Sequence, residues 1–218
     1  MQNKESTEMS MKQKSFYIYI AAYLAILIPL PGRFVFGLTL MFELFLLTVI
    51  GTLINSLIKT LKLKEIHSVI LLTVLISFVI LYRQLLIITY TEIAFTLGFY
   101  IYLPAVSLFL LYFLFDETQD SLLVNLKANT KKTFLFSLSG ILFFLFRDIA
   151  SYGTFTFFGT NHQIYEKILF NPEKIGIFSF FATIPGALIL AGVILFVNIV
   201  FRKKFRIIKN AEIQNDVH

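Results

Sequence analysis

The stretch that decides the fold is Phe34–Ile58, FVFGLTLMFELFLLTVIGTLINSLI, in which Glu43 is the only charged residue. About 20 apolar residues in a helix cross the hydrocarbon core of a bilayer, which is about 30 Å thick. The whole chain has the same character, because 57% of its 218 residues are hydrophobic and only 15% are charged. Soluble domains carry about 25% charged residues, and a soluble domain of this size has too little interior to bury so much apolar surface. We therefore expect a membrane protein.

Five further apolar runs lie on either side of this stretch. The run Phe134–Phe146 is short for a span unless it extends through Arg147 and Asp148. We expect an all-α integral membrane protein with six transmembrane helices in residues 16–201, between an N-terminal segment, 1–15, and a basic tail, 202–218. The expected spans are Phe16–Leu30, Phe34–Ile58, Ile66–Tyr82, Ile93–Phe115, Phe134–Phe146 and Ile175–Phe201.

The Lys and Arg residues in the flanks indicate the orientation, since cytoplasmic loops carry an excess of them. With six spans, both termini lie on the same side as the loops after the second and fourth helices. This side holds 14 of the 19 Lys and Arg residues, namely Lys4, Lys12, Lys14, Lys59, Lys62, Lys64, Lys127, Lys131, Lys132, Arg202, Lys203, Lys204, Arg206 and Lys209. We therefore expect both termini in the cytoplasm and the chain in the cytoplasmic (inner) membrane. The net charge of +6 reflects this topology, and the basic tail is expected to anchor the last helix and not to bind nucleic acid.

Proline residues interrupt the first and fourth expected helices, at Pro29 and at Pro104. Proline removes a backbone donor and clashes with the preceding turn, so that a helix kinks or ends there. Broken spans at corresponding positions of two three-helix halves are typical of an inverted repeat, whose halves cross the membrane in opposite directions. We expect such a repeat, with halves at about 16–90 and 91–201; two ordinary proline kinks are the alternative.

The absence of cysteine excludes several kinds of chemistry. The chain has no Cys and three His, so disulfides, thiolate zinc sites, Cys nucleophiles and cysteine-ligated iron–sulfur clusters are ruled out. Asn161, His162 and Glu166 follow the fifth helix but are too sparse for a metal site. The sequence also contains no phosphate-binding loop, nucleophile elbow or pair of catalytic carboxylates. We expect no metal site and no enzyme that acts alone, which leaves open a place in a redox-driven ion translocase.

Several segments resemble the Rnf E and Nqr D membrane subunits. LFRDIASYGTFTFFG, Leu145–Gly159, is similar to the family segment IREILGxGTLFG, and FATIPGALILAGVILFVN, Phe181–Asn198, is similar to its last helix, LPPGAFxxLGxLLALxN. LAILIPLP, EIHSVILLTVLISFVI and YLPAVSLFLL match earlier family segments in the same order, so the resemblance covers Phe16 to Phe201. The motif residues either serve the family's function or only shape a turn and a helix kink. They are Gly153, Thr154, Pro185 and Gly186.

The resemblance implies a six-helix inverted-repeat subunit of an ion-translocating electron-transport complex, paired with a homologous six-helix subunit of opposite orientation. In that family the broken helices of the two partners supply cysteines that together hold a two-iron, two-sulfur cluster at the midplane. The corresponding positions here are Ile28, beside Pro29, and Leu110, after Pro104. Aliphatic side chains cannot ligate iron, so we expect no cofactor unless the partner ligates a cluster entirely. The expected role is structural or in an ion pathway.

Charged residues inside spans are candidate ion or polar contacts, because they are costly in lipid and usually face a bundle interior. Glu43 is either a contact for an ion or substrate, or a neutral acid that is hydrogen-bonded within the bundle. Arg147 and Asp148 are adjacent and do not face one another, and we expect both to snorkel to water at the outer interface. On the helical repeat, Glu43 lies opposite Thr48, Thr52 and Asn55, and Arg147 shares a small-residue face with Ser137, Gly140, Phe144 and Ser151.

Two other functions are compatible with the sequence. A small-molecule transporter or substrate-capture module, such as the membrane components of energy-coupling-factor importers, has a similar size. Ala21 and Ala25 form a small-residue pair suited to helix docking in such a module, which would bind a small-molecule ligand. A redox-active subunit whose cluster ligands all come from its partner would instead give an iron–sulfur signal.

Overall fold

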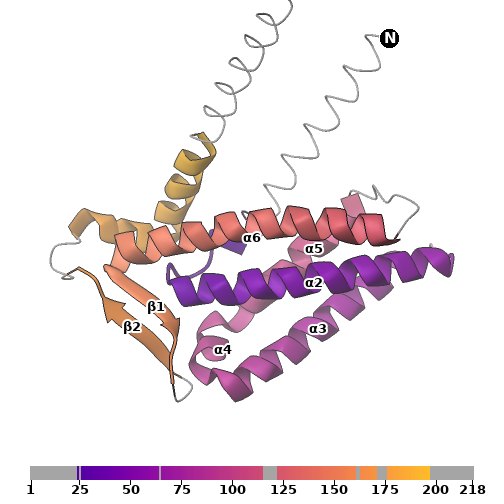
Figure 1. The fold of residues 1–218 in the computed structure, drawn as a ribbon, viewed down its shortest axis with the longest axis horizontal. Helices are drawn as coiled ribbons and strands as arrows, with labels where there is room; N and C mark the ends of the chain where they lie inside the picture. The colour runs from indigo at the N-terminus through magenta and orange to yellow at the C-terminus, as the bar shows by residue number, and fades with distance from the viewer. Residues whose placement is uncertain are drawn as a thin grey trace, which may run out of the picture.

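The computed structural model of the chain describes residue 24 and residues 26–63, 65–114, 122–160, 163–170 and 176–196 (Figure 1). These residues are mostly helical and form a bundle with a two-stranded sheet at one end. Four helices are long and apolar enough to cross a membrane, and they correspond to the second to fifth expected spans. The predicted terminal segments, 1–15 and 202–218, lie outside the described residues, as do parts of the first and sixth spans. Six spans and an inverted repeat therefore stay predictions.

An antiparallel pair of helices, α2 (Phe34–Thr60) and α6 (Leu122–Tyr152), forms the centre of the bundle (Figure 1). Glycines allow the close approach of the two helices: Gly37 faces the ring of Phe144, and Gly140 faces the sulfur of Met41. The predicted small-residue face of α6 is confirmed as the packing face. Its buried members are Ser137, Gly140, Phe144, Arg147 and Ser151.

The fifth span is longer at both ends than the predicted Phe134–Phe146. Lys127, Lys131 and Lys132, which were expected in a loop, lie exposed on the first turns of α6. Its 31 residues make a helix about 46 Å long, whereas the hydrocarbon core is only about 30 Å thick. The lysine-bearing turns can therefore reach the headgroup region while the rest of α6 spans the membrane.

The third and fourth spans pack against each other and against α2. Helix α3 (His67–Thr89) extends beyond the predicted third span and is separated from α4 (Thr91–Leu97) only by Tyr90. Its buried residues recur at helical spacing and face the other helices, whereas most of its remaining surface is exposed. These buried residues are Leu71, Leu75, Val79 and Leu86.

The fourth span is interrupted, but not at the predicted residue. After α4, a 3-10 helix, η1 (Gly98–Tyr102), leads into α5 (Leu103–Leu114). The interruption begins at Gly98, whose φ of +47° is in the left-handed region that glycine tolerates. Pro104 is the second residue of α5, where a missing N–H costs no helical hydrogen bond. The break predicted at Pro104 therefore lies just before it.

Thr154–Phe158 and Ile164–Ile168 form the strands of a β-hairpin where we expected a loop, so the all-α prediction is wrong here. Strand β1 (Thr154–Phe158) pairs antiparallel with β2 (Ile164–Ile168), with Thr154 opposite Ile168 and Phe158 opposite Ile164. The alternation in TFTFF is typical of a strand with one polar and one apolar face. Its phenylalanines, Phe155 and Phe157, stack on Phe34 with ring centroids 5.3 and 6.5 Å away.

Pro185 and Gly186 shape the junction between η3 (Gly176–Ala182) and the helix Ile184–Phe196. Thr183 caps this helix, since its Oγ1 accepts a hydrogen bond from the Gly186 N–H at 3.3 Å. A Cβ atom at position 186 would lie 2.1 Å from the Phe180 carbonyl oxygen, so the junction has room only for glycine. The interpretation of these two motif residues as shaping elements agrees with this geometry.

Gly37→Ala is expected to lower the thermal unfolding midpoint, because a Cβ atom there would lie 2.2 Å from the Phe144 ring. Overpacking of this kind costs about 1–3 kcal/mol. Gly192→Ala is the matched control, since no described residue would lie within 4 Å of a Cβ atom added there and alanine favours a helix. Thermal unfolding in detergent, followed by circular dichroism, compares them; equal midpoints for the two variants would contradict the tight α2–α6 contact.

Candidate functional site

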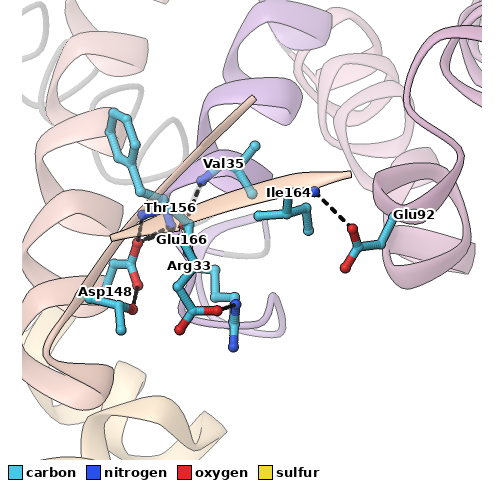
Figure 2. A network of polar contacts seen from close by, with 9 residues as sticks. Arg33, Val35, Glu92, Asp148, Thr156, Ile164 and Glu166 are labelled. Carbon is cyan, nitrogen blue, oxygen red and sulfur yellow. Dashed lines mark hydrogen bonds and ion pairs between the residues drawn. The ribbon is translucent and has the colours of Figure 1, made fainter. Parts of the chain in front are cut away.

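Asp148 caps the start of α2 from a different helix (Figure 2). Arg33, the N-cap residue of α2, makes no side-chain capping bond. The Asp148 carboxylate instead accepts the Phe34 N–H at 3.1 Å, the Thr156 N–H at 2.9 Å, the Thr156 hydroxyl at 2.7 Å and the Thr154 hydroxyl at 3.0 Å. A negative charge at a helix N-terminus is favourable, so this arrangement suits an ionised carboxylate.

Arg147 binds backbone carbonyls of two segments that are far apart in the sequence. Its Nη1 donates to the Leu30 carbonyl at 2.7 Å, Nε to that of Phe181 at 2.8 Å and Nη2 to that of Ala182 at 2.9 Å. Gly32 makes room for the side chain, since a Cβ atom there would lie 2.9 Å from Nε. The guanidinium thus satisfies carbonyls of the turn before α2 and of η3, which have no helical partners.

The prediction that Arg147 and Asp148 snorkel to water is wrong, because both residues are 0% exposed. They do not face one another, as predicted, and each serves a different segment. Asp148 binds Phe34, 114 residues earlier in the chain, and the hairpin, whereas Arg147 binds Leu30, 117 residues earlier, and η3. Sequence reasoning missed these contacts because nothing in the local pattern indicates which distant backbone lies beside α6.

The outer edge of the hairpin is held by two further acids (Figure 2). Glu166 forms an ion pair with Arg33 at 2.7 Å, and Glu92 accepts the Ile164 N–H at 2.8 Å. The Arg33 guanidinium also lies over the Tyr152 ring, 5.3 Å from its centroid. These contacts tie β2 to the start of α2 and to α4. The acids were visible in the sequence, but their roles depend on the hairpin, which sequence reasoning did not predict.

Glu43 is buried without any hydrogen-bond partner. Its side chain lies in α2 and is 1% exposed, and neither carboxyl oxygen has a donor or acceptor among the described residues. One helical turn before Glu43, the Thr39 carbonyl accepts a hydrogen bond from the Tyr82 hydroxyl of α3 at 3.0 Å. The described residues give Glu43 no hydrogen bond, so the alternative in which it is hydrogen-bonded within the bundle stays a prediction.

The hydroxyl and amide residues of α2 lie on the side away from Glu43, as predicted. Thr48 Oγ1 lies 3.1 Å from Thr133 Oγ1, and Thr52 accepts a hydrogen bond from Asn129 at 3.3 Å, both across the α2–α6 contact. Nearer the lysine-bearing end, Asn55 Oδ1 lies 2.6 Å from His67 Nε2. These groups bind one another and do not continue a polar path from Glu43.

The positions that correspond to the iron–sulfur ligands do not fit a cluster. Ile28 lies in the turn after the short helical segment that ends at Leu27, just before Pro29, and Leu110 lies on α5 with 44% of its surface exposed. Neither side chain has a donor atom for iron, and the chain has no cysteine. Within the described ranges, no three His, Asp or Glu side chains lie close enough together to hold a metal ion.

Comparison of the chain with models of known protein families, with curated proteins and with solved structures finds no match. The resemblance to the Rnf E and Nqr D subunits therefore stays a prediction that rests on the sequence motifs.

Asp148→Asn is expected to lower the thermal unfolding midpoint, because the amide NH₂ would face backbone and hydroxyl donors. A buried donor left without a partner costs about 1–3 kcal/mol. Glu92→Gln is the matched control, since Glu92 is exposed and accepts one hairpin N–H, and its loss costs within about 0.5 kcal/mol.

Hydrogen exchange at residues 33–36 and 153–158 would locate the effect of Asp148→Asn. Faster exchange confined to these segments is expected. If Asp148→Asn unfolded at the same temperature as Glu92→Gln, the capping role would be refuted.

Proposed function

We propose that this chain is an ion-pathway subunit of a larger membrane assembly, not an enzyme by itself, and that Glu43 is its ion contact. The observation that carries this proposal is the buried carboxyl group of Glu43, which has no partner among the described residues. Burying such a group is costly, and ionisable residues inside membrane spans usually mark ion or substrate pathways.

The other buried charges support this assignment by contrast. Three charged side chains are buried in the described part of the chain: Glu43, Arg147 and Asp148. Arg147 and Asp148 use their polar atoms to hold backbone segments together. Glu43 contributes no such bond, so the fold gains nothing visible from its charge. A buried charged residue that lowers stability and makes no structural contact is best explained by a function.

The resemblance to Rnf E and Nqr D supplies the class of assembly that we propose, an ion-translocating electron-transport complex. A homologous six-helix subunit is the proposed partner, and electrons would cross elsewhere, since Ile28 and Leu110 offer no ligands. The proposed location is the cytoplasmic membrane with both termini inside. The five described lysines at the common end of α2 and α6 support this orientation. They are Lys59, Lys62, Lys127, Lys131 and Lys132.

A second candidate function, capture of an apolar small molecule, is favoured by one groove. It has a volume of about 820 Å³ and lies between α6, the end of the hairpin, η3 and the helix Ile184–Phe196. Phe146, Phe181 and Leu190 are among its apolar lining residues. A ligand that purifies with the protein and raises its unfolding temperature would favour this function over the first.

Glu43→Gln is expected to abolish ion translocation by the assembly without dissociating it. Gentle purification from native membranes should recover a homologous membrane subunit with both wild-type and variant chains, and ion flux should be measured in proteoliposomes. Glu92→Gln, an exposed acid at the hairpin end, is the control that should retain flux. A chain that purifies without any membrane partner, or unchanged flux in Glu43→Gln, would overturn the proposal.

Glu43→Leu is expected to raise the thermal unfolding midpoint while it abolishes flux. Leucine replaces an unpartnered buried carboxyl with apolar surface, and residues kept for function often reduce stability. Unfolding in detergent gives the measurement. A lower midpoint for Glu43→Leu would indicate a structural role for the carboxyl group instead.

A further inference from the structure

The surroundings of Glu43 favour an uncharged carboxyl group. A carboxylate accepts hydrogen bonds and needs donors around it, and the Asp148 carboxylate receives four. Glu43 receives none from the described residues and is 1% exposed. Burial without donors disfavours the charged form of an acid. The two buried acids of this chain thus occupy opposite environments.

No charged group of the neighbouring elements balances Glu43. On α3, the Tyr82 hydroxyl donates to the Thr39 carbonyl, and the described part of the chain contains no ion pair between Arg83 and Glu43. Helix α5 carries no acidic or basic residue, and β1 consists of threonine and phenylalanine. On α6, Arg147 and Asp148 are bonded to other groups, and the lysines lie at the opposite end of the helix.

The oxygen atoms near Glu43 are too few for a metal cation. Calcium takes six to eight oxygen ligands, and magnesium requires about six in octahedral geometry. The described groups offer the two carboxyl oxygens, the Tyr82 hydroxyl and the Thr39 carbonyl, which already accepts the Tyr82 proton. A proton needs only one of these atoms.

We propose that Glu43 is a proton-binding site near the middle of the membrane. Glu43 lies nine residues beyond the start of α2, or about 14 Å along the helix, about halfway through a hydrocarbon core of about 30 Å. One proton from water converts the carboxylate to the acid, and its return to water restores the carboxylate. This inference rests on the proposed function and names its ion.

Infrared spectroscopy of the full chain in lipid nanodiscs tests the proton site directly, with the C=O stretching band of a protonated carboxyl as its signal. The wild type should show this band at neutral pH, and it should move in D₂O and disappear as the pH is raised. Glu43→Gln should lack the band, whereas Glu92→Gln, the exposed acid control, should keep it.

Three results would overturn the proton site: no band in the folded wild type, a band that neither exchanges in D₂O nor changes with pH, or a band that Na⁺ or Ca²⁺ removes at constant pH. The last would indicate a metal cation. Since the isolated chain is measured, failure here is distinguishable from failure to find a partner or ion flux.

Discussion

The hydrogen bonds of Arg147 and Asp148 to distant backbone are the interaction on which the hairpin end of the structure depends. In lipid, every backbone polar group must find a partner inside the protein. The turn before α2 and the 3-10 helix η3 are not regular α-helix, and the first N–H groups of α2 have no acceptor within the helix, so the local backbone cannot supply all partners. Two adjacent side chains of α6 point to different segments and satisfy both. This constraint explains why two charges are buried there without facing each other.

The hairpin depends on the same constraint. Strand β1 turns its threonines to Asp148 and its phenylalanines to Phe34, so its polar face completes the cap of α2 while its apolar face covers the helix start. Gly153, with a φ of +65°, ends α6 in a conformation that directs the chain into the strand. Beyond the hairpin end, α2 and α6 remain in contact, and Gly37 and Gly140 allow their close approach.

Glu43 stands apart from this network, and the difference is chemical. Arg147 and Asp148 are surrounded by partners of the complementary kind, which makes each charge structural. Among the described residues, Glu43 has no hydrogen-bond partner, and the Tyr82 hydroxyl donates to the Thr39 carbonyl. Burial alone therefore does not distinguish a functional charge from a structural one; the presence or absence of complementary partners does.

Hydrophobic runs predicted the second to fifth spans because length and apolar composition are local properties of the chain. The observed helices end at other residues than predicted, because Pro104 is tolerated in the first turn of α5 and α6 continues through its lysines beyond the lipid core. The hairpin was missed although TFTFF alternates, because five residues after a long helix give only a weak period. The predicted loop after the fifth helix and the predicted snorkelling of Arg147 and Asp148 were wrong, because both outcomes depended on distant neighbours.

The sequence by itself determined that the chain belongs in a membrane, that α6 has a small-residue face for close packing, and that Glu43, Arg147 and Asp148 are unusual charges. Only the tertiary structure decided what those charges do. Hydrophobicity and helical period act over a few residues, whereas a hydrogen bond depends on which atoms meet. Arg147 meets Leu30 across 117 positions of the chain, and Glu43 meets no donor among the described residues; neither fact is written in the residues beside them.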